Sequence, residues 1–180
     1  NMVRHVAHLV ELHQQTDKLI SLTLEPEPCC FIETIDESVA FFDGHLYSVA
    51  AREFLQGLTG LDGAAADAAL RRHLGLCLDL CHAAIEFEDA AEVVRKLKAA
   101  DISVGKMQIS AGLRFAPVGD RTLELLRPFD DAVYLHQTVA KHDGALTRHV
   151  DLKQAFESHS AGARSDEWRV YFHVPVFLDD

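Results

Sequence analysis

The chain has 180 residues, and an apolar fraction of 48% is enough for a substantial core, which excludes intrinsic disorder and collagen-like structure. Its 17 basic and 28 acidic residues give a formal net charge of −11, so the surface repels phosphate backbones and we expect no nucleic-acid partner. No segment approaches the roughly 18 to 20 apolar residues of a membrane helix, and residues 1–5 do not resemble a signal peptide, so no membrane partner is expected. The four cysteines lack a secreted-scaffold spacing, which indicates a reducing, cytoplasmic compartment.

Apolar periodicity, capping boxes and turn residues predict helices that alternate with strands. In chain order we expect a helix at 2–15, a strand at 19–25, helices at 34–46 and 64–72, a strand at 74–79, a helix at 89–100, a strand at 102–109, a helix at 120–127, strands at 132–139 and 145–150, a helix at 151–158 and a strand at 168–177. This alternation favours an α/β layered fold with parallel strands and helical crossovers.

Polar side chains follow several of the predicted strands. In parallel α/β folds the carboxyl ends of the strands point the same way, so side chains at these ends gather in one place. The residues in question are Glu25, Asp79, His82, Lys106, Gln108, His136 and His173. Together they form an oxygen and nitrogen ligand set that suits Mn, Mg, Zn or Co.

Each of these residues also has a structural interpretation. Glu25 could cap the segment after its strand, His82 could be a satisfied histidine at a helix start, and His173 could be a hydrogen-bonded core histidine. Asp79 favours function most, because a carboxylate directly after five apolar residues must be paired or metal-bound. Cys77 and Cys81 do not have the spacing of a zinc knuckle, so buried thiols are expected there.

Five segments carry a resemblance to a known superfamily. They are Leu-Glu-Pro-Glu-Pro at 24–28, Cys-Leu-Asp-Leu-Cys-His at 77–82, Gly-Lys-Met-Gln-Ile-Ser at 105–110, Tyr-Leu-His-Gln at 134–137 and Phe-His-Val-Pro-Val-Phe at 172–177. Together they resemble the xylose-isomerase-like TIM-barrel superfamily, in particular its sugar phosphate isomerase/epimerase and metabolite-traffic branch. The resemblance implies a metal-dependent sugar or sugar phosphate isomerase or epimerase with a small sugar-like substrate.

The resemblance also implies roles for individual residues. Glu25 corresponds to a strand-end glutamate that binds metal or acts as the base, and Asp79 to a metal-binding aspartate. His82 corresponds to a histidine that is a ligand or contacts substrate. Gln108 stands where many relatives have a metal-binding histidine, and His173 lies near the place of a late glutamate. Lys106, on the same strand face as Gln108, could stabilise an enediolate oxygen or a phosphate.

A closed eight-stranded barrel needs about 250 residues, whereas this chain supplies four or five convincing core strands. We therefore expect a single partial barrel domain over 1–180, a C-terminal fragment lacking the first strands and possibly the last. A compact open sheet is the alternative. A fragment would have an incomplete metal site and exposed barrel edges, which would favour a homo-oligomer. Two other functions stay open, namely a non-catalytic metabolite-binding or trafficking protein and an endonuclease IV-like phosphodiesterase, which the net charge disfavours.

Overall fold

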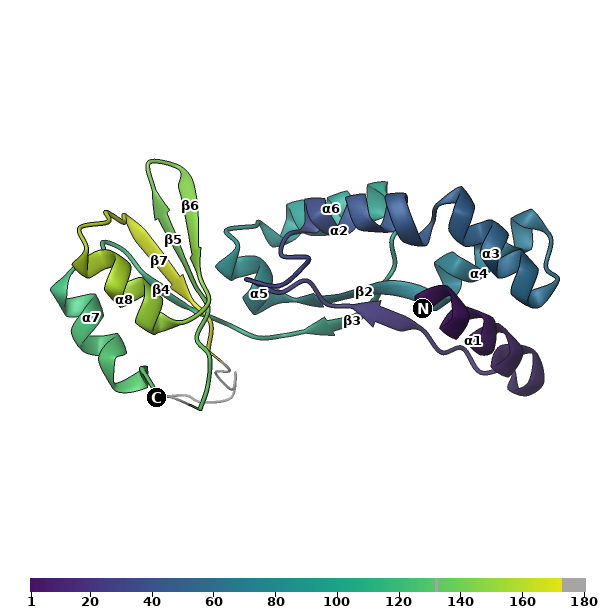
Figure 1. The fold of residues 1–180 in the computed structure, drawn as a ribbon, viewed down its shortest axis with the longest axis horizontal. Helices are drawn as coiled ribbons and strands as arrows, with labels where there is room; N and C mark the ends of the chain where they lie inside the picture. Colours follow the sequence, from purple (N-terminus) through teal and green to yellow (C-terminus); the bar gives the residue numbers. More distant parts are fainter. Residues whose placement is uncertain (132, 173–180) are drawn as a thin grey trace. The chain divides into compact units, whose positions relative to one another are not determined.

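The computed structural model describes residues 1–131 and 133–172, and in it the chain forms two compact units. The first unit consists of Asn1–Pro26, Ile35–Leu78 and Ala91–Met107. The second consists of Glu27–Thr34, Asp79–Ala90 and the described residues from Gln108 onward. The fold is mixed α/β, with a parallel sheet in the first unit and an antiparallel sheet in the second (Figure 1).

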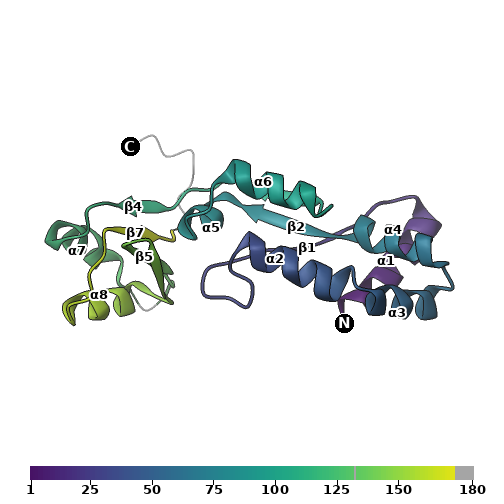
Figure 2. The same ribbon diagram turned by 90° about the horizontal axis from the view of Figure 1, so that it is seen from above.

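The sheet of the first unit has the strand order β1-β2-β3. β1 (Leu22–Leu24) pairs in parallel with β2 (Leu74–Asp79), and Leu24 lies opposite Leu76. β3 (Val104–Gln108) is the other neighbour of β2 and is largely exposed. Two helices, α2 (Ile35–Phe41) and α6 (Ala90–Ala99), lie over the sheet on either side of β2 (Figure 2). Lys96 of α6 and Asp36 of α2 form an ion pair of 2.6 Å between these helices.

The path of the chain beside β2 requires a residue without a side chain. A Cβ atom at Gly75 would lie 2.7 Å from the backbone oxygen of Ser103, which is closer than van der Waals contact allows. The glycine therefore lets the segment before β3 approach β2, where Leu76 N donates to Ser103 O at 2.8 Å. All six residues of β2 are buried, as expected for a central strand of a parallel sheet.

The rest of the first unit is helical. α1 (Met2–Thr16) buries Val6, Leu9 and Val10 on one face, which confirms the amphipathic helix predicted over 2–15. It packs with α3 (Val49–Thr59) and α4 (Gly63–His73). The helix predicted over 34–46 is α2 followed by a π-helical turn at Phe42–Leu46. α3, which begins at the side-chain cap of Ser48, was not predicted from the sequence.

The sheet of the second unit is antiparallel, with the strand order β4-β7-β5-β6. Its strands are β4 (Leu113–Phe115), β5 (Thr138–His142), β6 (Ala145–His149) and β7 (Glu167–Val170). α5 (Leu80–Ile85), α7 (Asp120–Leu126), a 3₁₀ turn at Arg127–Phe129 and α8 (Leu152–Ser160) complete the unit.

Helices cover both faces of this sheet, with α7 and α8 on one side and α5 on the other (Figure 1). The first face packs Trp168 and Val170 of β7 against Leu126 and Leu152. On the second face, Val139 and Tyr171 contact Cys81 and Ile85 of α5. Along β7 the buried Trp168 and Val170 alternate with the charged, partly buried Glu167 and Arg169, so one face of this strand is apolar.

Two strand predictions are wrong in the second unit. The strand expected over 132–139 begins only at Thr138, and the hairpin continues from it through Asp143 and Gly144. The strand expected over 168–177 was predicted to be one of the parallel strands, whereas its described part, β7, pairs antiparallel with β4 and β5. The β5–β6 hairpin precedes β7 in the chain, and β7 pairs with β5 of that hairpin. No closed barrel is present in the described residues, and the single partial barrel domain stays a prediction.

Glu167 on β7 allows a test of the second unit by pH. Arg114 lies 2.8 Å from this carboxylate and Arg169 lies 2.7 Å from it. The hydrogen bond from Arg114, followed by that from Arg169, lowers the pKa of Glu167 from 4.5 to about 2. A lowered folded-state pKa stabilises the fold above pH 4.5, and this stabilisation is lost as the pH falls toward 2.

We therefore expect Glu167→Gln to flatten the loss of stability between pH 4.5 and 2, while lowering stability slightly at neutral pH. Urea unfolding followed by fluorescence of Trp168, the single tryptophan, measures this directly. Parallel pH profiles of the native chain and the variant would contradict the expectation.

Candidate functional site

Asp79 is the last residue of β2 and the N-cap of α5. Its side chain is only 5% exposed. Oδ1 accepts hydrogen bonds from the backbone N–H groups of Cys81 at 2.8 Å and His82 at 3.3 Å. The sequence places an acidic residue here because a strand that ends directly in a helix leaves free N–H groups, and an aspartate side chain accepts them.

Two side chains at and just beyond the end of β3 also donate to Asp79. The amide nitrogen of Gln108 lies 2.5 Å from Oδ2, and the hydroxyl of Ser110 donates to Oδ1. Ser110 also accepts from the backbone N–H of Cys81 at 3.0 Å. The carboxylate is thus held in one orientation by donors from two segments of the second unit, which satisfies the requirement that a buried charge be hydrogen-bonded.

His82 lies beside this carboxylate. Its Nε2 is 4.0 Å from Asp79 Oδ2, and its side chain is 5% exposed. The ring also packs against Tyr171, with the two ring centroids 5.0 Å apart. The spacing of three residues between Asp79 and His82 therefore brings a carboxylate oxygen and an imidazole nitrogen together on the first turn of α5.

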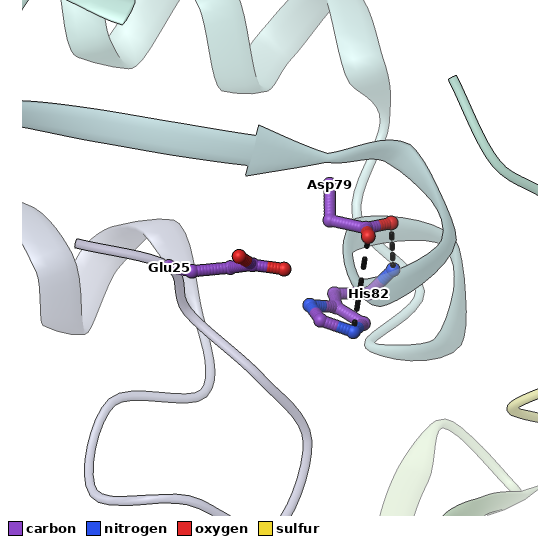
Figure 3. A group of neighbouring side chains, drawn as sticks. All are labelled: Glu25, Asp79 and His82. Carbon is purple, nitrogen blue, oxygen red and sulfur yellow. Dashed lines mark hydrogen bonds and ion pairs between the residues drawn. The ribbon is translucent and has the colours of Figure 1, made fainter. Parts of the chain in front are cut away.

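Figure 3 shows the carboxylate of Asp79 beside the imidazole of His82 at the start of α5. Glu25 follows β1, the parallel neighbour of β2, and is itself exposed. A second carboxylate–histidine group lies on the second unit at the β5–β6 turn, where ligand atoms of His142, Asp143 and Asp166 lie within 4.8 Å of one another. There the carboxylate of Asp166 accepts from the backbone N–H of Asp143 at 3.0 Å.

The other predicted site residues have different surroundings. Gln108 presents its amide nitrogen to Asp79, so its oxygen is not the atom that faces the carboxylate. Lys106 is an exposed residue of β3. His136 donates from Nδ1 to the backbone oxygen of Tyr171 at 3.1 Å, and its ring stacks on Phe172. His173 lies outside the described residues.

The cysteines do not form a metal site in the described structure. Burial raises the pKa of Cys81 to about 12 and that of Cys29 to about 11, so both thiols stay protonated at neutral pH. Cys77 is buried as well, in accordance with the expected buried thiols. Cys30, in contrast, is exposed.

Ser110 is the residue of this cluster whose role the sequence did not indicate. It lies two residues beyond Gln108, so the two side chains leave an extended segment on the same side. The rule that alternate residues of an extended segment share a side could therefore have indicated Ser110, had it been applied beyond the end of the predicted strand.

No protein-family model, no curated protein and no solved structure matches this chain. Among the helices of the described residues, none has the length and hydropathy needed to cross a membrane.

Proposed function

We propose that the second unit carries a divalent metal site centred on Asp79 and His82, and that the protein is a metal-dependent isomerase or epimerase of a small sugar or sugar phosphate. The observation that carries the proposal is a buried carboxylate held by four hydrogen-bond donors, with an imidazole nitrogen 4.0 Å from its second oxygen. Buried carboxylate–histidine pairs of this kind are typical of metal and acid–base sites.

The hydrogen bonds of Asp79 support a single metal contact. Oδ1 accepts from the backbone of Cys81 and His82 and from Ser110, which uses its lone pairs. Oδ2 accepts from Gln108, which leaves this oxygen one lone pair on the side of His82. Asp79 thus fits a metal as a monodentate ligand through Oδ2, with His82 Nε2 as the nitrogen ligand.

The remaining roles are proposed from sequence position and from the resemblance. Glu25, directly after β1, would supply a second carboxylate as ligand or base. Lys106 of β3 would neutralise an enediolate oxygen or a phosphate, and His173 would complete the ligand set. A bound divalent cation would polarise the carbonyl and hydroxyl oxygens of the substrate. These residues, on the partial barrel expected from the sequence, make up the proposed isomerase.

A second candidate is a metabolite-binding or trafficking protein without catalysis. Gln108 favours it, because the amide nitrogen that faces Asp79 cannot ligate a metal, whereas the histidine of the resembling family can. Both proposals expect the protein to bind a small metabolite, and only the isomerase proposal expects it to convert that metabolite. The homo-oligomer expected from exposed sheet edges belongs to either, and the exposed Val104 and Met107 on β3 support it.

The deciding substitution is Asp79→Asn, which keeps the size of the side chain and removes its charge. Asn Oδ1 retains the three Oδ1 bonds, and Gln108 can turn its amide to present oxygen to the new NH₂ group, so the fold should survive. We expect the bound Mn, measured by mass spectrometry of the purified protein, to fall at least about 100-fold. Isomerisation in a screen of aldoses, ketoses and their phosphates should fall with it.

Asp143→Asn is the matched control, since it makes the same chemical change in the second carboxylate–histidine group. It should leave metal content and turnover as they are. Loss of metal in Asp143→Asn, with retention in Asp79→Asn, would move the metal site to the β5–β6 turn and end the proposal. Metal retention by native chain that isomerises none of these sugars would favour the trafficking protein.

A further inference from the structure

Two histidines meet in the helical part of the first unit, in a region that the proposed function does not use. His13 lies in the last turn of α1, and His73 is the last residue of α4. Their ring centroids are 6.1 Å apart, and the ring planes are inclined by 69°. α1 and α4 pack against each other, so the two rings lie at one end of a helix–helix contact.

The same connecting segment orients both rings. His13 Nδ1 lies 3.2 Å from the backbone oxygen of Lys18, and His73 Nδ1 lies 2.7 Å from that of Ile20. A carbonyl oxygen only accepts, so each Nδ1 must carry the proton. In the neutral rings each Nε2 therefore keeps its lone pair. The left-handed turn at Asp17, which ends α1, returns the chain past both histidines.

His73 is completely buried, and its Nε2 has no hydrogen-bond partner among the residues that the structure describes. A buried acceptor without a donor costs about 1–3 kcal/mol. Protonation does not relieve this cost, because burial lowers the pKa of His73 and keeps the ring neutral. Nε2 of His73 is therefore held in place with its lone pair available, and a neutral imidazole nitrogen is the form of histidine that binds metal ions.

We propose that His13 and His73 bind one transition-metal ion of the Zn²⁺ type through their Nε2 atoms. Histidine ligands almost always donate their other N–H to a backbone carbonyl or carboxylate, and both of these rings do so. With Zn–N distances of about 2.1 Å, two imidazoles on one ion have ring centres about 5 to 6.5 Å apart, a range that includes the observed spacing. Water fills the remaining positions on the side of His13, which is only partly buried.

The ion would connect the ends of α1 and α4, so its effect is on the stability of the first unit. The test is a Zn²⁺ titration of the full chain in the Asp79→Asn background, which removes the other proposed site. His13→Phe keeps an aromatic ring against His73 and removes the ligand nitrogen. His8→Phe is the matched control, because His8 is an exposed residue of the same helix.

We expect Zn²⁺ to raise the midpoint of thermal unfolding by about 4 °C or more in the background chain and in His8→Phe. His13→Phe should lose this rise, and its calorimetric affinity for Zn²⁺ should fall at least about tenfold. In the unsubstituted chain, side-chain ¹⁵N spectra should show the Nε2 signals of His13 and His73 shifting together on saturation. Equal Zn²⁺ responses of the His8 and His13 variants, or unshifted Nε2 signals, would overturn the proposal.

Discussion

Arg148→Met is expected to destabilise the second unit by about 3–5 kcal/mol. The guanidinium of Arg148, on β6, binds both carboxylate oxygens of Glu86, and the side chain of Glu86 is 0% exposed. Arg148 also lies 3.2 Å from Glu33. Methionine would keep a long, apolar side chain at this position. It would remove the cation that pairs with the carboxylates of Glu86 and Glu33. Removing one partner of a buried ion pair is strongly destabilising, because the remaining charge stays in a poorly solvated position.

Urea unfolding followed by Trp168 fluorescence reports this loss, because Trp168 is buried in the same unit. Arg121→Met serves as the control. It removes an arginine that pairs with Glu124 on the exposed face of α7, where ion pairs contribute about 0–1 kcal/mol. The double variant Arg148→Met/Glu86→Gln should regain part of the stability, since it removes the buried charge as well. Equal unfolding midpoints for Arg148→Met and the native chain would show that this pair contributes nothing net.

Asp79→Ala should destabilise the second unit by about 3 kcal/mol, in contrast to the tolerated Asp79→Asn. Alanine leaves the backbone N–H groups of Cys81 and His82 without their cap, and the Gln108 amide and Ser110 hydroxyl without this acceptor. Loss of a helix cap costs about 0.5–2 kcal/mol, and each further buried donor left unsatisfied adds about 1–3 kcal/mol. Partial rearrangement of the side chains keeps the total below the sum.

Asp151→Ala in the same unit is the reference for an ordinary cap. Asp151 is the N-cap of α8 and accepts from the backbone N–H groups of Leu152 and His136, so its loss should cost about 1 kcal/mol. Both variants are compared by the same fluorescence measurement. If Asp79→Ala proves no more destabilising than Asp151→Ala, the donors from Gln108 and Ser110 do not stabilise the fold.

Local signals in the sequence predicted many of the elements. The apolar run before Asp79 predicted a buried strand, and β2 has the predicted bounds of 74–79. The Asp143-Gly144 pair between two of the predicted strands forms a hairpin turn, and both residues take the positive φ angles that a two-residue turn needs. These features depend on residues close in the chain, which is why periodicity and turn chemistry were sufficient.

The position of Asp79 at a strand end was likewise determined by the sequence, and so was the proximity of His82 three residues later. Only the tertiary structure decided which atoms Asp79 contacts. Gln108 was predicted as an oxygen ligand, yet its nitrogen faces Asp79, because the segments after β2 and β3 meet and a carboxylate selects the donor end of an amide.

The direction of β7 was also decided by tertiary structure. Its alternating apolar residues predicted a strand but carry no information on its partners, since parallel and antiparallel neighbours bury the same faces. In the structure β7 pairs antiparallel with β5 of the hairpin that precedes it in the chain. Sequence patterns thus determined many of the local elements and the acidic end of β2. Strand partners and the orientation of each donor depended on contacts between residues far apart in the chain.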